Sequence, residues 1–218
     1  MKRRIIVNAV LACMVVGGGV IVAETVRVAG SAPKSPAAVA ARELPPSPAS
    51  QKPPADIPQG MPKTLSLQTP EGVLIAPTEI DQTLLPKQPD GSVKPGDKPG
   101  VYVADGVSTL PGTHQGTVVI GGHAKASKDM VFNPLLQLGK DDLGHSQVLV
   151  DMPEGQLTYT IEALYLVDKV DLPTQHALAD NRPGRLLLIT CDVEDGRDTF
   201  QNLIVIACDP SHQGCGDA

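Results

Sequence analysis

The chain has 218 residues and a formal net charge of −6, with 18 Lys and Arg against 24 Asp and Glu. No basic patch accompanies this acidic balance, so a nucleic acid is not an expected partner. Aromatic residues are scarce, with no Trp, two Phe and three Tyr. A hydrophobic core must therefore be built from Val, Leu and Ile.

The N-terminus combines a basic tip with an uncharged apolar segment. Residues 1–4 are Met-Lys-Arg-Arg, and residues 5–23 form a run of 19 without a charged residue, about the length of a membrane-spanning helix. Basic residues before a span stay in the cytoplasm. The sequence therefore predicts a single-pass protein of the cell membrane, with a cytoplasmic tip and an extracellular remainder. A cleaved signal peptide is the alternative, although residues 22–24 fit a cleavage site poorly.

A spacer rich in Pro and Ala follows at residues 24–63. Nine prolines lie between residues 31 and 62, and most other residues there are Ala, Ser, Lys and Gln. Such a composition cannot bury enough apolar area to fold, so we expect an extended extracellular linker. Residues 64–210 then suit one domain with its own core, and residues 211–218 form a short C-terminal tail.

The domain is predicted to be mainly β, because short apolar runs alternate with turn-forming Pro and Gly residues. The expected strands are residues 72–75, 101–104, 117–120, 148–152, 157–167, 186–190 and 203–207. Residues 153–156, Pro-Glu-Gly-Gln, are expected to join two of them in a hairpin. Residues 132–138 suggest one short helical turn. Strands at this density favour a sandwich or a barrel.

Cys191 is the first candidate for chemistry. It closes the apolar run of residues 186–190 and precedes a turn-like segment, which predicts a thiol at the rim of a sheet. A free Cys has a pKa of about 8.5 and attacks as the thiolate, so it needs a base or a cation nearby. His123 ends another strand-like run, and Arg197 is the only Arg after Cys191. The residues alone leave open whether these three side chains meet.

Three segments of the chain form a recognisable series. They are Gly121-Gly122-His123, then Val131-Phe132-Asn133-Pro134-Leu135 with Leu138, and then Leu187-Leu188-Ile189-Thr190-Cys191. Together, these segments resemble the sortase family. The similarity covers roughly residues 70–208 in the order of the family, and it looks closest to the class E and F sortases of actinobacteria. The chain departs from the T-L-x-T-C signature at Leu187, which stands where the family has its first Thr.

The resemblance implies a closed, sortase-like β-barrel with short helices and the activity of a cysteine transpeptidase. Cys191 would attack an LPxTG-like sorting signal between Thr and Gly, and an amine from a peptidoglycan precursor or a pilin would resolve the thioacyl intermediate. His123 would act as acid and base, and Thr190 would help to position the acyl oxygen. No pair of His residues has metal-ligand spacing, so neither a metal nor a cofactor is predicted.

The catalytic arginine is where the chain departs from the family. Sortases carry this Arg shortly before the final Ala of the last strand, and the corresponding position here, counted back from Ala207, is Asn202. We therefore assign the catalytic role to Arg197, with Asn202 as the alternative, a neutral donor to a substrate oxygen. Arg182 and Arg185 are interpreted as solvated loop charges.

Cys208 and Cys215 are separated by six residues, which permits a disulfide outside the cell and leaves Cys191 as a free thiol. Two functions stay open beside the transpeptidase. One is a secreted cysteine hydrolase that releases its product to water. The other is a catalytically weak binding protein on a sortase fold. The reason to consider it is that Asn202 stands where the family has its catalytic arginine.

Overall fold

The computed structural model describes residues 56–89, 92–113, 116–171, 180–212 and 215. The predicted membrane anchor at residues 5–23 and the predicted spacer up to residue 55 lie outside these ranges. Within them, no helix has the length and apolar character needed to cross a membrane. The described residues all belong to one compact unit, Ser50–Ala218.

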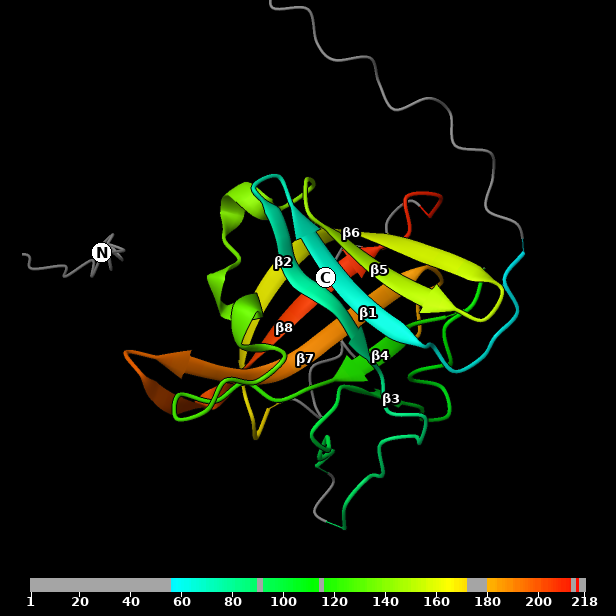
Figure 1. Cartoon of the computed structure of the whole chain (residues 1–218). Helices are drawn as coiled ribbons and strands as arrows, with labels where there is room; N and C mark the ends of the chain where they lie inside the picture. The colour runs from blue at the N-terminus through cyan, green and yellow to red at the C-terminus, as the bar shows by residue number, and fades with distance from the viewer. Residues whose placement is uncertain (1–55, 90–91, 114–115, 172–179, 213–214, 216–218) are drawn as a thin grey trace, which may run out of the picture. The chain divides into compact units, whose positions relative to one another are not determined.

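One sheet of eight strands forms this unit (Figure 1). The strands are β1 Thr64–Thr69, β2 Gly72–Glu79, β3 Gly100–Tyr102, β4 Val118–Gly121, β5 Gln147–Met152, β6 Gly155–Asp168, β7 Arg185–Glu194 and β8 Arg197–Cys208. Their order in the sheet is β2-β1-β5-β6-β8-β7-β4-β3, and only β4 and β7 pair in parallel. Two short 3-10 helices, η1 Asn133–Gln137 and η2 Lys140–Asp142, lie between β4 and β5. The prediction of a mainly β domain with short helices is confirmed.

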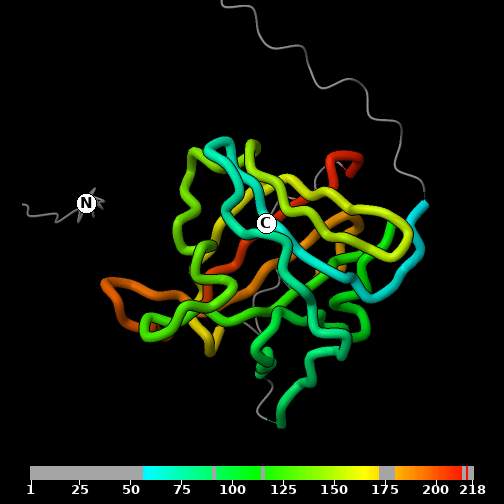
Figure 2. Tube along the Cα trace, viewed as in Figure 1, coloured from blue at the N-terminus to red at the C-terminus, as the bar shows by residue number. Residues whose placement is uncertain are grey.

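The sheet curls around its interior, as the trace in Figure 2 shows, but its edges are joined only loosely. No ladder links the edge strands β2 and β3. Asp81 forms a single bridge with Gly100, and the Asp81 N–H donates to the Pro99 carbonyl at 2.8 Å. Prolines at 86, 89, 95 and 99 occupy the connection and lack the N–H that a ladder needs. The closed barrel expected from the sequence is therefore corrected to a curled half-barrel.

The first strand, β1, is absent from the sequence prediction. Its residues Thr-Leu-Ser-Leu-Gln-Thr alternate as a half-buried strand should, and Leu65 and Leu67 are fully buried. Pro62 and Pro70 flank this run and disguise it as part of the spacer. Pairing with both β2 and β5 makes the segment a strand despite its flanks.

The chain packs against the domain before β1 begins. Ile57 is 5% exposed and belongs to the main core. The Thr113 N–H donates to the Ile57 carbonyl at 2.8 Å, and the Gly60 N–H donates to the Pro111 carbonyl at 3.1 Å. The folded unit therefore includes residues that the sequence analysis assigned to the spacer.

Strands β7 and β8 carry apolar side chains on both faces. On the inner face, Leu186 and Leu188 join the large core around which the sheet curls. On the outer face, Leu187 packs with Ile204 and Ile206 in a second, smaller cluster. A strand covered on both faces shows a continuous apolar run instead of an alternation, which explains the sequence of β7.

The C-terminal residues close over the start of β7. Cys208 and Cys215 form a disulfide with a Cα–Cα distance of 5.8 Å, and Cys191 is the free cysteine among the described residues. Cys208 pairs in register with Arg185, the first residue of β7. The predicted tail is therefore attached to the sheet at Cys215, which is 4% exposed.

Replacing this disulfide by Cys208→Ala/Cys215→Ala should lower the free energy of unfolding by about 2–3 kcal/mol, because the short loop no longer restricts the unfolded chain. Urea unfolding followed by circular dichroism measures the change. Cys191→Ser is the matched control, since it removes a thiol without opening a loop. Equal stability of the double variant and the wild type would show that the disulfide does not stabilise the fold.

Candidate active site

Cys191 lies within β7, where the regular part of the sheet ends. The strand continues to Glu194, beyond the end at Thr190 that the sequence predicts. Pairing with β8 becomes irregular directly after Cys191: one residue of β7, Asp192, faces residues 199–201 of β8. The thiol is half-buried. Cys191 thus occupies the last regular position before a bulge, and this position corresponds to the sheet rim that the sequence predicts for the thiol.

His123 comes level with Cys191 through the parallel pairing of β4 and β7. Gly121 pairs with Ile189, and the Gly122 N–H donates to the Ile189 carbonyl at 3.1 Å. Continuing this register by two residues sets His123 opposite Cys191. Side chains alternate along both strands, so the two residues share the outer face of the sheet.

Asn202 is the direct cross-strand partner of Cys191 in the antiparallel ladder of β7 and β8. Directly opposed residues have Cβ atoms about 5 Å apart and point to the same face. His123, Cys191 and Asn202 therefore form a row across β4, β7 and β8, here called the outer-face row. All three side chains are half-buried. The row combines a thiol, an imidazole and a neutral amide, and each can reach a molecule bound on this face.

Arg197 lies at the turn of the β7–β8 hairpin, which projects from the sheet in Figure 1. It is exposed and pairs with Glu194, and Asp195 and Gly196 form the turn between them with positive φ. By the alternation along the strands, the side chains of the pair Val193 and Asp198 have the same orientation as Cys191. The next pair, Glu194 and Arg197, therefore has the opposite orientation. The register does not bring Arg197 into the outer-face row.

Thr190 occupies the inner face, opposite the Cys191 thiol. Its side chain is 2% exposed, and its Oγ1 has no hydrogen-bond partner among the described residues. Because Thr190 points to the inner face, the orientation of β7 does not account for the predicted contact between Thr190 and an acyl oxygen.

Two glycines before His123 leave room on the two faces of β4. A Cβ at Gly122 would lie 2.5 Å from Cδ2 of Phe132, which is fully buried. A Cβ at Gly121 would lie 3.1 Å from Leu85 Cδ1 and 3.4 Å from Pro95 Cγ. The Gly-Gly-His sequence thus lets a core aromatic ring and an outer loop approach the strand end that carries the histidine.

The loop after His123 is held in place by side chains that the sequence analysis did not single out. The Phe132 N–H donates to the His123 carbonyl at 3.2 Å and closes the base of the loop. Within the loop, the Asn133 amide accepts from the Lys125 N–H at 2.9 Å and donates to the Lys125 and Lys128 carbonyls. No sequence pattern beyond the Phe-Asn-Pro-Leu match points to this role of Asn133.

A contact across the site joins this loop to the β7–β8 hairpin. The Ala126 N–H donates to Asp198 Oδ1 at 2.8 Å. Figures 1 and 2 show the loop after β4 running beside the projecting hairpin. On the hairpin itself, Thr199 Oγ1 donates to Asp192 Oδ2 at 3.0 Å and fastens the bulge. The loop that follows the histidine is therefore linked to the hairpin that follows the thiol.

Arg185 corrects a sequence interpretation. It is fully buried rather than a solvated loop charge. Its Nε donates to Thr117 Oγ1 at 3.1 Å, and its Nη2 donates to the Asp180 carbonyl. Burial, together with the charge of Arg182, lowers the pKa of Arg185 to about 10, although Asp180 opposes the shift. Arg185 thus fastens the end of the β6–β7 connection to the start of β4.

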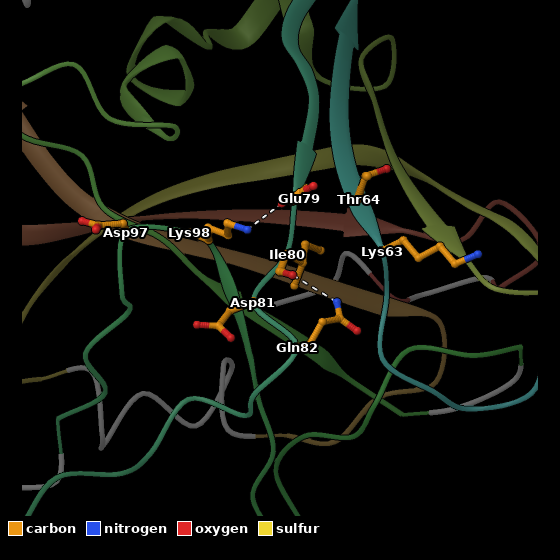
Figure 3. Close-up of a pocket in the computed structure, with 8 residues that line it drawn as sticks. All are labelled: Lys63, Thr64, Glu79, Ile80, Asp81, Gln82, Asp97 and Lys98. Atoms are coloured by element: carbon orange, nitrogen blue, oxygen red, sulfur yellow. Dashed lines mark hydrogen bonds and ion pairs between the residues drawn. The ribbon is translucent and has the colours of Figure 1, made fainter.

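A cavity of about 690 Å³ lies at the edge where β1 and β2 approach the β2–β3 connection (Figure 3). It is lined by Lys63, Thr64, Glu79, Ile80, Asp81, Gln82, Asp97 and Lys98. Lys98 and Glu79 form an ion pair there at 2.5 Å, and the hydrogen bond from Lys98, together with its charge, lowers the pKa of Glu79. Its lining contains neither a thiol nor an imidazole.

Comparisons with known proteins identify the family of the chain. The family model described as "Sortase domain" matches residues 75–209, which is more than half of the chain and includes His123 and Cys191. No curated protein sequence matches. Similar solved structures include sortase A from Listeria monocytogenes, at 16% identity, TM-score 0.45, and coverage of 68% of this chain and 87% of that chain. Sortase A from Corynebacterium diphtheriae has 21% identity, TM-score 0.45, and coverage of 70% and 65%. The catalytic domain of sortase D from B. anthracis has 23% identity, TM-score 0.43, and coverage of 73% and 95%. On the extent of the family match, the chain belongs to the sortase family of cysteine transpeptidases.

Proposed function

We propose that Cys191 is the nucleophile and His123 the general acid and base of a transpeptidation on the outer face of the sheet. The observation that carries this proposal is the parallel register of β4 and β7, in which His123 comes level with Cys191. The substrate class follows from the family: an LPxTG-like sorting signal on a surface protein. An imidazole beside a thiol satisfies the requirement of a nucleophilic cysteine for a base.

The reaction proceeds in two acyl transfers. The Cys191 thiol passes its proton to His123, and the thiolate attacks the Thr carbonyl carbon of the Thr–Gly peptide bond. The C–N bond breaks, and His123 returns the proton to the leaving glycine nitrogen. An amine from a peptidoglycan precursor or a pilin then attacks the thioester carbonyl and gives its proton to His123. The C–S bond breaks, and His123 passes this proton to the departing sulfur, which restores the Cys191 thiol.

The location follows from the N-terminal pattern. A basic tip before 19 uncharged residues supports an anchor at residues 5–23, with the catalytic domain outside the membrane. The packing of Ile57 on the core supports a spacer that ends before β1 and passes directly into the folded unit.

For the acyl oxygen, the register favours Asn202 over Arg197. Asn202 is the ladder partner of Cys191, whereas Arg197 pairs with Glu194 at the hairpin turn. The Asn202 amide supplies two N–H donors and no charge. A neutral donor aimed at the developing oxyanion is sufficient for stabilisation of this type.

The nucleophile is tested by incubating the full-length protein in detergent with LPxTG-like peptides and a glycine amine. We expect mass spectrometry to show an acyl adduct on Cys191 that has lost the glycine-side fragment, followed by the transfer product. Cys191→Ala should form no adduct, and His123→Ala should react about 10²–10⁴-fold more slowly. The matched control is His145→Ala, which changes an exposed histidine.

The other outcomes identify the alternative functions. An adduct that passes only to water, whatever amine is supplied, would indicate the hydrolase. If no peptide forms an adduct while a small alkylating reagent still modifies Cys191, the protein is a sortase-fold binding protein and the transpeptidase proposal fails.

Asn202→Ala should lower kcat/KM for the peptide by about 10²–10³-fold, the usual loss for one oxyanion donor. Arg197→Ala should leave kcat/KM close to the wild-type value, because Arg197 lies outside the outer-face row. Steady-state kinetics of both variants measure the difference. The reverse pattern would return the catalytic role to Arg197, as the sequence assigns it.

Asp198→Ala should slow acylation of Cys191 roughly twofold to tenfold, because the loop that carries His123 loses a hydrogen bond worth about 1 kcal/mol. Asp198→Asn keeps an acceptor oxygen for the Ala126 N–H, so its rate should stay near that of the wild type. Glu194→Ala removes a carboxylate from the same hairpin and serves as the charge control. If Glu194→Ala and Asp198→Ala slow the reaction equally, the effect comes from charge and not from the contact.

A further inference from the structure

The imidazole of His123 has one hydrogen-bond partner among the described residues, and that partner is a backbone carbonyl. His123 Nε2 lies 2.9 Å from the carbonyl oxygen of Pro95, in the β2–β3 connection. A carbonyl oxygen only accepts, so Nε2 must carry a proton. In the neutral ring the other nitrogen, Nδ1, then keeps its lone pair. The contact therefore assigns separate roles to the two nitrogens.

We propose that the Pro95 carbonyl is a positioning group that holds His123 as the Nε2–H tautomer and reserves Nδ1 for proton transfer. This inference rests on the proposed function, in which His123 is the acid and base. The Cys191 proton moves to Nδ1, and the ring becomes an imidazolium that still donates from Nε2 to Pro95. Nδ1 then releases the same proton to the leaving glycine nitrogen. Charge on the donor strengthens the bond to the carbonyl while the thiolate exists.

The neighbouring residues are shaped to bring this carbonyl to the histidine. Gly121 leaves the outer face of β4 open, and the Pro95 ring and the Leu85 side chain occupy the space that a Cβ there would crowd. Leu85 is itself fixed, because it is 6% exposed and its N–H donates to the Val101 carbonyl at 2.8 Å. The ring of Pro95 restricts its own φ, which narrows the directions that its carbonyl can take.

A base that is oriented by a third group is the general arrangement for an activated nucleophile. In this site no Asp or Glu of the described chain bonds to His123, so a carbonyl from a loop takes the position that a carboxylate often fills. The β2–β3 connection thereby becomes part of the catalytic arrangement, although it contributes no side chain to the chemistry.

The test uses nuclear magnetic resonance of the full-length protein in detergent with isotope-labelled histidine, in which His123→Gln identifies the His123 signals. Long-range nitrogen–proton spectra of the neutral ring report the tautomer, and exposed His145 is the internal reference. We expect a proton on Nε2 of His123 that exchanges with water more slowly than that of His145. A neutral ring with its proton on Nδ1, or an Nε2 proton that exchanges as fast as in His145, would overturn the proposal.

Variants then connect this signal to the loop. Gly121→Val should displace Pro95 and Leu85, because its methyl groups extend beyond a Cβ that would already lie 3.4 Å from Pro95 Cγ and 3.1 Å from Leu85 Cδ1. The displacement should remove the slow exchange of the Nε2 proton and slow acylation of Cys191 by about 10–100-fold. Gly121→Val/Leu85→Ala frees part of the space again and should recover most of both. Protection that survives in Gly121→Val, or acylation that falls in the single variant without recovery in the double variant, would contradict the proposal. Because the spectra do not depend on turnover, wild-type protection without any acyl transfer would remove the proposed function and leave the tautomer assignment standing.

Discussion

Parallel pairing between β4 and β7 aligns His123 with Cys191, two residues that are too far apart in the sequence for local structure to bring together. Parallel neighbours cannot be joined by a tight turn, and β5 and β6 lie between these two strands in the sequence. The height of His123 relative to Cys191 therefore follows from this ladder, whose last pair, Gly121 and Ile189, lies two residues before them. A slip of one residue would move the histidine to the other face of the sheet. Apolar contacts on both faces of β7 oppose such a slip, because every shifted register would exchange its inner and outer side chains.

Beyond this ladder, the strand end is held from both sides. Gly122 admits the Phe132 ring on the inner face, and Gly121 admits the β2–β3 connection on the outer face. Larger residues at both positions would push the two neighbours away from the backbone that leads into His123. A pair of glycines would ordinarily loosen a strand. Here close packing replaces the rigidity that side chains would have supplied.

The sequence predicts those parts of the site that local patterns encode. A buried apolar run that ends in Thr-Cys, and another that ends in Gly-Gly-His, identify the candidate thiol and imidazole without knowledge of their separation. The prolines around β1 hide that strand although its alternation is regular. Other prolines, at positions 86, 89, 95 and 99, lie at the edge where the predicted barrel fails to close, and none of them has the N–H group that a ladder needs.

Contacts between distant backbone atoms and side chains leave no such pattern. The Pro95 carbonyl bonds to His123, 28 residues away, and the Asp198 carboxylate bonds to Ala126, 72 residues away. Neither residue type by itself indicates such a contact. From the sequence, Arg185 is interpreted as solvated because it follows a Pro-Gly turn. Its partners, Thr117 and the Asp180 carbonyl, come within hydrogen-bonding distance only when β4 and β7 pair.

In the proposed site, Asn202 takes the place of a catalytic arginine beside the thiol, and this changes how the site handles charge. A guanidinium would stabilise both the thiolate and the oxyanion through its fixed positive charge. An amide offers only a dipole, so the positive charge that balances the thiolate must reside on His123. The ring can accept that proton only if its other nitrogen stays protonated and well aligned, which gives the carbonyl of Pro95 more importance than it would have beside an arginine. Stabilisation by a neutral donor is also screened little by salt. In the proposed mechanism, an uncharged oxyanion donor therefore makes catalysis depend more strongly on a histidine that a loop carbonyl holds in position.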